Sequence, residues 1–282
     1  MSIKFMARGT LAALIVVGLS VALPLSASAA GRSHARHHRL TATKPTIVLV
    51  HGAWADSGSW NRVIRRLQRD GYTVWAPPNP LMGLETDSAT IADFLHKIDG
   101  PIVLVGHSYG GEVITNAAYG DSQVKALVYV DAYIPAQGDS LESLTGAGSC
   151  FAVPQSDLPN LFTFVPFPGA PTGIYDAYVK QNVFPGCFAN GLPAREAAEL
   201  AATQRPLATN ALMDPSGAPA WATTPSWAVI GTADHVIPPA DPLSMARRAG
   251  ANVTEIDAPH LSMIADPGVV TNVIEQAATH TR

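Results

Sequence analysis

One segment near residue 105 most constrains how this chain can fold. The apolar run Val103 to Val105 leads into Gly-His-Ser-Tyr-Gly at 106–110, and a helical pattern follows from Glu112 to Tyr119. A Gly-x-Ser-x-Gly turn between a strand and a helix is so sharp that side chains beside the serine would collide with neighbouring backbone. The segment predicts that Ser108 projects alone above a sheet edge, at a helix N-terminus whose dipole favours negative charge. Ser108 is therefore the candidate nucleophile.

Further apolar runs resemble the one before Ser108. The run before Ser108 spans 102–105, and the others lie at 46–50, 72–75, 124–130, 227–230 and, more weakly, 252–256. Continuous rather than alternating hydrophobicity is typical of strands buried on both faces, as in a parallel sheet. Helical stripes, such as Val63, Ile64 and Leu67 after Trp60, lie between the runs. Because strand and helix alternate, the sequence predicts an α/β fold with a mostly parallel, doubly wound sheet and helices on both faces.

The alternation breaks between about residues 135 and 225. This stretch is rich in Pro, Gly and aromatic residues and contains one clear helical pattern near Ala194 to Thr203. An insertion of this length is too long for a plain loop, so we predict a lid. Its aromatic residues would roof an apolar pocket, form a small core within the lid, or do both.

The first residues have the features of an export signal. Lys4 and Arg8 precede the apolar run Leu11 to Leu25, and small residues with Ala-x-Ala spacing follow. This pattern predicts a signal peptide over 1–29, cleaved after Ala29 or Ala30, and hence a secreted protein. A retained membrane anchor is the alternative, although the run is short for a bilayer, which needs roughly 20 residues. Residues 30–44 are polar and basic, which predicts a disordered leader.

Length and charge limit the remaining possibilities. Residues 45–282 suit one domain with a lid insertion over about 135–225. Without Lys4 and Arg8, 16 basic residues stand against 22 acidic ones, a formal charge of about −6. That balance, with no basic block in the folded part, excludes the usual electrostatic features of nucleic-acid binding. The expected partner is a small molecule, without stable membrane insertion after signal cleavage; the oligomeric state stays open.

Two cysteines, Cys150 and Cys187, lie in the same Pro/Gly-rich stretch. Export from the reducing cytoplasm would permit a disulfide between them, which would restrict a loose segment. Two unpaired thiols are the alternative, because the sequence alone does not fix connectivity.

A serine hydroxyl needs a base to remove its proton, and His260 is the best-placed histidine. It lies between the last weak strand and the final helical pattern, where a loop can bring it over the carboxyl edge of the sheet. His96 falls in a helical pattern, His280 lies near the chain end, and His51 and His107 lie beside turns. We therefore predict His260 as the general base.

The imidazole must in turn be oriented by a carboxylate. Asp234 follows the run 227–230 directly, and Asp131 follows the preceding run at 124–130. We predict Asp234 as the acid and keep Asp131 as the alternative, otherwise bonded to backbone near the lid hinge. The resulting order along the chain, Ser then Asp then His, is the one expected of this kind of fold.

An acyl-transfer site also needs donors for the oxyanion of its tetrahedral intermediate. The backbone N–H of Tyr109, directly after the nucleophile, is one candidate. The other is the N–H of Ala53, in the His-Gly-Ala-Trp segment that follows the first run. His51 is predicted to fix that loop through a backbone hydrogen bond rather than to act as a second base.

Four segments together resemble the α/β-hydrolases. They are Val48 to Trp54, Gly106 to Gly111, the Asp234 loop, and His260 to Ile264 with Pro267. The similarity covers nearly all of Thr46 to Ala277 and is strongest to the branch of plant methyl esterases, hydroxynitrile lyases and related bacterial esterases. The lid matches only in general character.

The resemblance also bears on the reaction. Hydroxynitrile lyases of that branch carry a lysine directly after the catalytic histidine, whereas this chain has Leu261, and Met263 and Ile264 fit the esterase pattern. A serine at position 108 differs from members that use an aspartate nucleophile. The resemblance therefore implies a cofactor-free serine esterase acting on an apolar or aromatic ester or lactone. A non-enzymatic ligand-binding protein on a hydrolase shell, and a cofactor-free lyase or haloperoxidase, remain as alternatives.

Overall fold

The computed structural model describes residues 44–281 of the chain. The predicted signal peptide over 1–29 and nearly all of the predicted leader lie outside this range. Lys44, the last residue of that leader, belongs to the ordered part, since its ammonium group contacts the backbone oxygen of Asp70 and lies over the ring of Tyr72.

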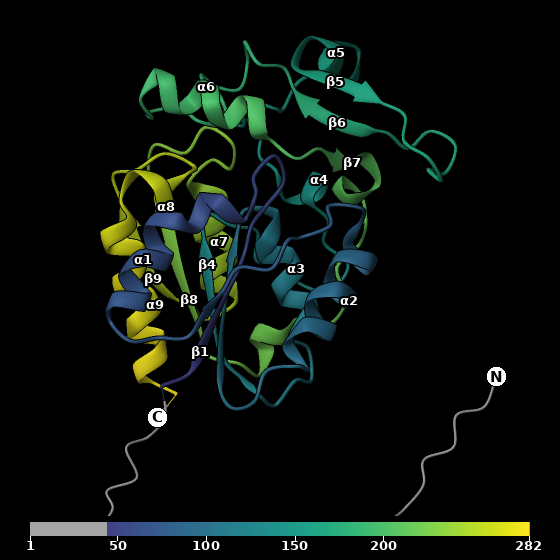
Figure 1. The fold of residues 1–282 in the computed structure, drawn as a ribbon. Helices are drawn as coiled ribbons and strands as arrows, with labels where there is room; N and C mark the ends of the chain where they lie inside the picture. Colours follow the sequence, from purple (N-terminus) through teal and green to yellow (C-terminus); the bar gives the residue numbers. More distant parts are fainter. Residues whose placement is uncertain (1–43, 282) are drawn as a thin grey trace, which may run out of the picture. The chain divides into compact units, whose positions relative to one another are not determined.

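A six-stranded sheet forms the centre of the described domain (Figure 1). Its strands, in spatial order, are β2 (Val74–Trp75), β1 (Thr46–Val50), β3 (Ile102–His107), β4 (Val124–Val130), β8 (Ser226–Gly231) and β9 (Asn252–Ile256). Every neighbouring pair is parallel. The predicted doubly wound α/β fold is confirmed, and the parallel pairing explains why the central strands are apolar on both faces.

Helices cover both faces of this sheet. They are α1 (Asn61–Arg69), α2 (Leu84–Leu95), α3 (Tyr109–Ala117), α7 (Ala240–Arg248), α8 (Ser262–Ala265) and α9 (Pro267–Thr279), with the 3-10 turn η1 (Ser57–Trp60). Helices α1 and α9 pack together on one side, and α2 and α3 pack together on the other (Figure 1). The apolar face predicted for this helix is confirmed at three positions, since Trp60, Val63 and Leu67 are fully buried.

Most of the segment between β4 and β8 forms a separate layer over the carboxyl ends of the strands, whereas its last part returns along the body beside α3 to the start of β8 (Figure 1). It contains a second, three-stranded sheet in the order β5-β6-β7, in which both pairings are antiparallel. Its elements are α4 (Leu141–Leu144), η2 (Gln155–Asp157), α5 (Leu158–Leu161), β5 (Phe162–Val165), β6 (Asp176–Val179), α6 (Ala194–Thr203), β7 (Leu207–Ala208), η3 (Thr209–Leu212) and η4 (Ala220–Ala222). We call residues 135–225 the lid.

The lid is tied internally by a disulfide between Cys150 and Cys187. The bond joins residues 37 apart in sequence. It therefore restrains a segment whose regular structure is short and discontinuous.

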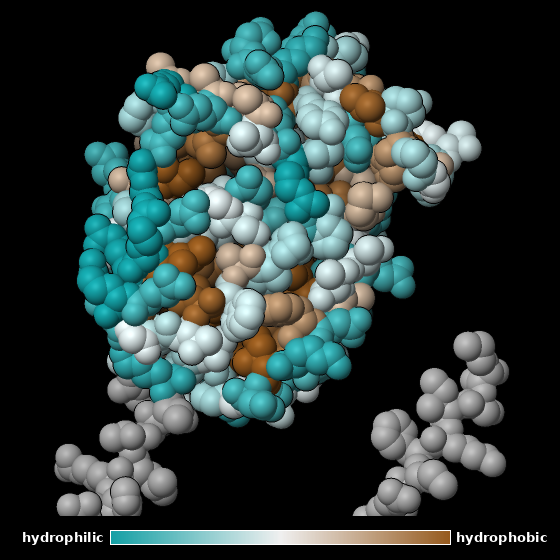
Figure 2. All heavy atoms as spheres, viewed as in Figure 1, coloured by the Kyte–Doolittle hydropathy of each residue, from teal (hydrophilic) through white to brown (hydrophobic). Residues whose placement is uncertain are grey.

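The surface of the described domain is mixed in polarity. On the face shown in Figure 2, hydrophilic residues predominate, and apolar residues appear at several separate places. Within residues 44–281, no helix is both long and apolar enough to cross a bilayer.

Candidate active site

The serine predicted as nucleophile lies in a strained turn at the end of β3. Ser108 has φ 54° and ψ −126°, a conformation that L residues rarely adopt, and α3 begins at the next residue. A side chain at Gly106 would collide with the backbone of Gly110 and come within 2.8 Å of the Gly111 nitrogen. The glycine requirement inferred from the sequence therefore has a direct steric cause.

The predicted base and acid are in direct contact. His260 Nδ1 lies 2.8 Å from Asp234 Oδ2, and both side chains are almost completely buried. The other oxygen of Asp234, Oδ1, accepts hydrogen bonds from the backbone N–H groups of Val236 and Ile237 at 2.7 and 3.0 Å. These two donors fix the carboxylate, so the ring of His260 is held with Nδ1 as the donor.

The Nε2 atom of His260 is buried and has no hydrogen-bond partner among the described residues. With the proton held on Nδ1 by Asp234, this nitrogen keeps a free lone pair, as a general base requires. The centre of the His260 ring lies 4.7 Å from that of His107, the residue immediately before Ser108. His107 Nε2 also lies 3.0 Å from the backbone oxygen of His260. The structure thus packs the loop of His260 against the turn of Ser108, without a hydrogen bond between His260 Nε2 and the Ser108 hydroxyl.

The alternative acid, Asp131, has a different set of contacts. Its Oδ1 accepts from Gly231 N at 2.7 Å and its Oδ2 accepts from Ser262 N at 3.2 Å. These bonds join the loop before Asp234 to the loop after His260. Burial, together with the nearby negative charge of Asp234, raises the pKa of Asp131 to about 7. The contacts therefore assign Asp131 to loop support and place Asp234 on the imidazole.

The predicted oxyanion loop lies over the nucleophile turn. A Cβ added at Gly52 would come within 2.7 Å of the Ser108 Cβ and 3.2 Å of the Tyr109 nitrogen. Within residues 44–281, the N–H groups of Ala53 and Tyr109 donate to no other protein group. Two amides of neighbouring segments are thus available beside Ser108 for an oxyanion.

His51 fixes this loop, as its sequence position suggested. Its Nδ1 lies 2.9 Å from the backbone oxygen of Gly52, and its Nε2 accepts the N–H of Asn79 at 3.0 Å. One ring nitrogen donates and the other accepts, so the ring is neutral. Burial lowers the pKa of His51 to about 4, which keeps it uncharged at neutral pH.

Sequence reasoning missed a second support of the nucleophile turn. The hydroxyl of Tyr109 donates to Asp87 Oδ2 at 2.7 Å, and Asp87 also accepts from the N–H groups of Met82 and Gly83. Burial raises the pKa of Asp87 above its usual value. The only available signal was an Asp in a helical pattern, which gives no indication of a partner 22 residues away.

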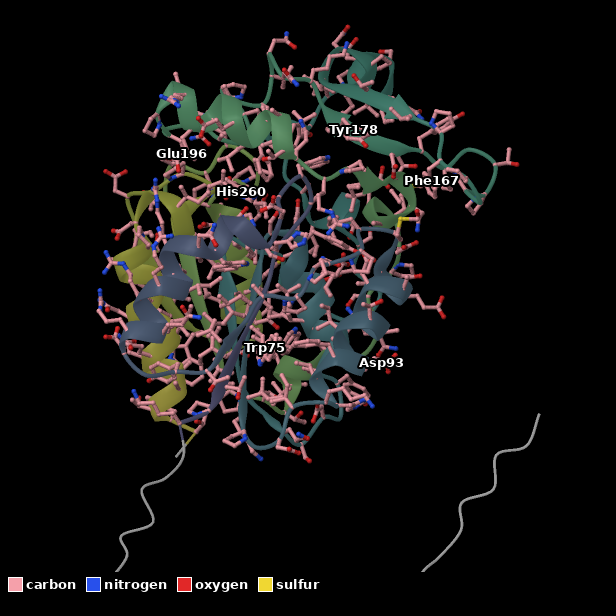
Figure 3. The ribbon with its side chains drawn as sticks, viewed as in Figure 1. Trp75, Asp93, Phe167, Tyr178, Glu196 and His260 are labelled. Carbon is pink, nitrogen blue, oxygen red and sulfur yellow. A yellow bond between two sulfur atoms is a disulfide. The ribbon has the colours of Figure 1, made fainter. Side chains whose placement is uncertain are left out.

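Aromatic side chains of the lid reach the site. The ring of Phe188 lies 5.2 Å from that of His260 and 5.9 Å from that of Trp54, which also contacts Phe151 and Phe162 at 5.0 and 5.5 Å. Figure 3 shows His260 below the lid, which carries Glu196 and Tyr178. The aromatic residues of the lid therefore both pack on one another and roof the site.

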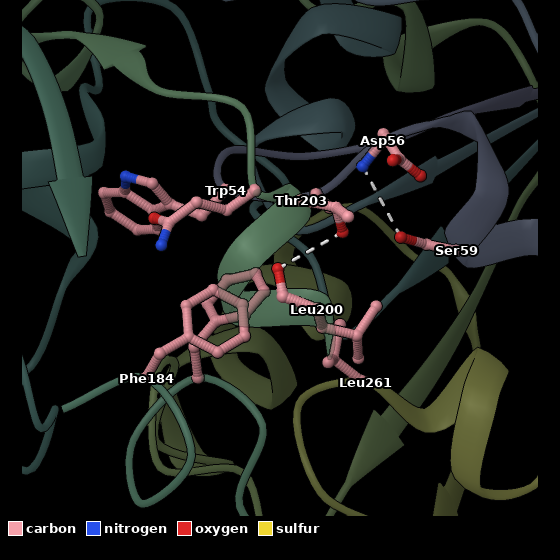
Figure 4. Close-up of a pocket in the computed structure, with 10 residues that line it drawn as sticks. Trp54, Asp56, Ser59, Phe184, Leu200, Thr203 and Leu261 are labelled. Carbon is pink, nitrogen blue, oxygen red and sulfur yellow. Dashed lines mark hydrogen bonds between the residues drawn. The ribbon is translucent and has the colours of Figure 1, made fainter. Parts of the chain in front are cut away.

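A small pocket opens between the lid and the body beside these rings (Figure 4). Its apolar wall comes from Trp54, Phe184, Phe188, Leu200 and Leu261, and its polar wall from residues that include Asp56 and Thr203. The volume is about 10 Å³, close to the space that one water molecule needs. Neither Ser108 nor His260 lines this pocket, although Leu261 directly follows His260, and the pocket is too small in this structure to hold an organic molecule.

Comparison with known proteins agrees with this architecture. Residues 47–273 match the Alpha/beta hydrolase family. A carbendazim hydrolyzing esterase of Nocardioides sp. is 34% identical over 110 residues, covering 34% of this chain and 46% of that protein. A pyrethroid hydrolase of Sphingobium wenxiniae is 30% identical over 118 residues, covering 38% of this chain and 42% of that protein. These matches span less than half the length of either relative.

Solved structures show the same fold over most of the described domain. The pyrethroid hydrolase from Sphingobium faniae JZ-2 superimposes with a TM-score of 0.66 at 21% identity, covering 84% of this chain and 98% of that chain. The methylesterase MES16 from Arabidopsis superimposes with a TM-score of 0.67 at 14% identity, covering 83% and 99%. The family match extends over most of the chain, and these structures share its fold, so this chain belongs to the alpha/beta hydrolase family.

Proposed function

We propose that this protein is a secreted serine hydrolase of carboxylic esters, with Ser108 as nucleophile, His260 as general base and Asp234 as the orienting acid. The observation that carries the proposal is the 2.8 Å bond between His260 Nδ1 and Asp234 Oδ2, formed in a buried site beside the Ser108 turn. This bond leaves Nε2 as the proton acceptor that a serine nucleophile needs.

In the proposed reaction, Ser108 Oγ attacks the carbonyl carbon of the ester while its proton passes to His260 Nε2. The Ala53 and Tyr109 amides stabilise the negative charge that develops on the carbonyl oxygen. The tetrahedral intermediate then collapses to an acyl-enzyme, and His260 gives its proton to the departing alkoxide. Water repeats the sequence, with His260 again as the base, and releases the carboxylic acid.

The pocket wall supports an apolar or aromatic ester, or a lactone, as substrate. The aromatic rings of Trp54, Phe184 and Phe188 border the pocket, and no Lys or Arg lines it. A group without negative charge is therefore favoured in this pocket. The matched relatives, a carbendazim hydrolyzing esterase and a pyrethroid hydrolase, support a small organic ester as the substrate.

The test of this function is the loss of activity on removing one hydroxyl. Ser108→Ala should lower kcat for p-nitrophenyl butyrate by at least about 10⁴-fold, because members of a triad act as a unit. Ser88→Ala is the matched control, since that hydroxyl bonds only to backbone oxygens within α2. Activity that survives in folded Ser108→Ala protein would refute the assignment. Ligand binding without turnover in the unaltered protein would instead support a non-enzymatic binding role.

Export forms part of the proposal, and the Cys150–Cys187 disulfide supports it. Such bonds persist in oxidising compartments and are rare in the cytoplasm. The protein recovered from the culture medium of producing cells should have a mass that corresponds to cleavage after Ala29 or Ala30. A full-length chain retained with the membrane fraction would contradict secretion.

A further inference from the structure

Trp54 has an unusual backbone conformation directly beside a proposed donor of the oxyanion hole. It directly follows Ala53, whose amide is a proposed oxyanion donor, and its φ is 55°. Bulky residues rarely adopt a positive φ, and such a conformation persists only where surrounding structure holds it. The contacts that hold Trp54 therefore bear on the position of the Ala53 amide.

Those contacts come from the lid. The indole Nε1–H donates to the backbone oxygen of Ala177, in strand β6, at 2.8 Å. Three lid phenylalanines surround the ring, namely Phe151, Phe162 and Phe188. Trp54 is consequently only 7% exposed, although it belongs to the loop after β1.

The disulfide makes these lid contacts act as one unit. Phe151 directly follows Cys150, and Phe188 directly follows Cys187. The covalent bond therefore links the backbone next to two of the three rings that pack on Trp54. A lid movement that shifts one of these rings shifts the other with it.

We propose that Trp54 is a positioning residue that makes the oxyanion hole depend on lid closure. With the lid closed, the Ala177 bond and the phenylalanine rings hold the indole, and the strained backbone keeps the Ala53 amide beside Ser108. With the lid displaced, those contacts are lost and φ of Trp54 relaxes, which turns the preceding segment and moves the Ala53 amide away. The inference rests on the proposed function and adds a condition to it.

The closed pocket gives this coupling a role in the catalytic cycle. The pocket bordered by Trp54 has a volume of about 10 Å³, which is too small for an ester, so in this proposal the substrate enters with the lid displaced. Stabilisation of the transition state then requires the lid to close again over the bound ester. Acyl transfer is confined to the enclosed complex, from which bulk water is excluded.

Two matched substitutions test the coupling. Trp54→Phe keeps an aromatic ring but removes the N–H that bonds to Ala177. Trp221→Phe is the control, because its Nε1–H also donates to a backbone oxygen, that of Pro135 at 2.7 Å, and it lies outside the oxyanion loop. Measured quantities are kcat and KM for p-nitrophenyl butyrate, the Ki of an aryl trifluoromethyl ketone, and the melting temperature. The ketone forms a tetrahedral adduct with the serine and so reports on the oxyanion hole.

The expected result separates transition-state binding from substrate binding. Trp54→Phe should lower kcat about 10-fold or more and raise the ketone Ki by a similar factor, with KM within about 3-fold, because an interaction specific to the transition state is weakened. Trp221→Phe should leave kcat and Ki within about 2-fold of the unaltered protein. If kcat and Ki of Trp54→Phe are unchanged, whatever its KM, Trp54 only lines the pocket and the proposal is overturned.

Two further measurements remove ambiguity. If Trp54→Phe does not fold, Phe151→Leu weakens the same contact from the lid side and should also lower kcat and raise Ki; unchanged values would overturn the proposal. If Ser108→Ala keeps its activity, or if the ketone does not inhibit the unaltered protein, the proposed function has failed, and the coupling between Trp54 and the lid has not been tested separately. If Ser108→Ala loses its activity but Trp54→Phe has unchanged kcat and Ki, the proposed function stands and the coupling between Trp54 and the lid is refuted.

Discussion

Replacing Asp234 by asparagine tests the roles of two neighbouring carboxyl groups. In the structure, Oδ1 of Asp234 accepts from Val236 N and Ile237 N, and Oδ2 faces His260 Nδ1. In Asp234→Asn, the two backbone donors hold the amide oxygen at the Oδ1 position. The amide NH2 group then faces His260 and donates to Nδ1, so the ring proton moves to Nε2. His260 in that tautomer has no lone pair for the Ser108 proton.

The expected size of the effect follows from this tautomer. The same change in a Ser-His-Asp triad lowers kcat by about 10⁴-fold, although the geometry is kept. This corresponds to about 5 kcal/mol of transition-state stabilisation. The free energy of unfolding should change little, because the bonds to Val236 and Ile237 remain. The assay is kcat for p-nitrophenyl butyrate at pH 7.5, together with urea unfolding.

Asp131→Asn is the matched control for this prediction. Both of its carboxylate oxygens accept backbone N–H groups, from Gly231 and Ser262, and an amide can replace only one of these acceptors. Loss of one buried hydrogen bond should lower the free energy of unfolding by about 1–3 kcal/mol. The value of kcat should fall by less than about 10-fold, since the ring of His260 keeps its partner. If Asp131→Asn loses most of the activity and Asp234→Asn retains it, the acid has been assigned to the wrong residue.

Three other predictions concern stability. Glu112 is fully buried with both carboxyl oxygens unpartnered among residues 44–281, and burial raises its pKa well above 4.5. The folded protein then keeps a proton that the unfolded chain releases, so the free energy of unfolding should fall as pH rises above 4.5. Urea titrations at pH 5 and 8 should show this fall in the unaltered protein and not in Glu112→Gln. An equal fall in both proteins would contradict the prediction. The folded pKa of His51, about 4, lies below its ordinary value of 6.5, so its contribution is present above pH 6.5 and is lost, by up to about 3 kcal/mol, as pH falls towards 4. His51→Gln should be less sensitive to acid over that range, and an unchanged acid sensitivity would refute the reasoning. Replacing Cys150 and Cys187 by serine should lower the free energy of unfolding by about 4 kcal/mol for a loop of 37 residues, and an unaltered urea midpoint would show that the disulfide adds no stability.

The parts of the fold that repeat a strong local pattern were predictable from the sequence. Strands β1, β4 and β9 begin and end at the predicted residues, and β3 and β8 differ only at their ends. The strands β1, β3, β4 and β8 are mostly continuous apolar runs because the parallel sheet buries both of their faces, whereas the edge strand β9 is exposed or half-buried along its length. The position of Ser108 was predictable for the same kind of reason, since a turn so sharp requires glycine at fixed places.

Other features depend on contacts between distant residues. Asp131 and Asp234 both follow neighbouring strands, so sequence position alone did not separate them; the deciding fact is that Val236 and Ile237 orient Asp234 towards His260. The small sheet of the lid had no clear signal, because β5, β6 and β7 have only 4, 4 and 2 residues and pair with antiparallel neighbours across long loops.

The lid contacts of Trp54 were likewise invisible in the sequence. The residue was noted only as part of a motif after the first strand, whereas its bond to Ala177 joins positions 123 apart. A positive φ at a tryptophan has no sequence signature, since propensity alone argues against it.

The site of covalent modification by an organophosphonate tests the central claim most directly. Such a reagent reacts only with a serine that an adjacent base activates, so mass spectrometry of the peptides should place one adduct on Ser108 in the unaltered protein. The adduct should be absent or form far more slowly in His260→Ala. Modification at a different serine, or equal modification of Ser108 in His260→Ala, would contradict the account.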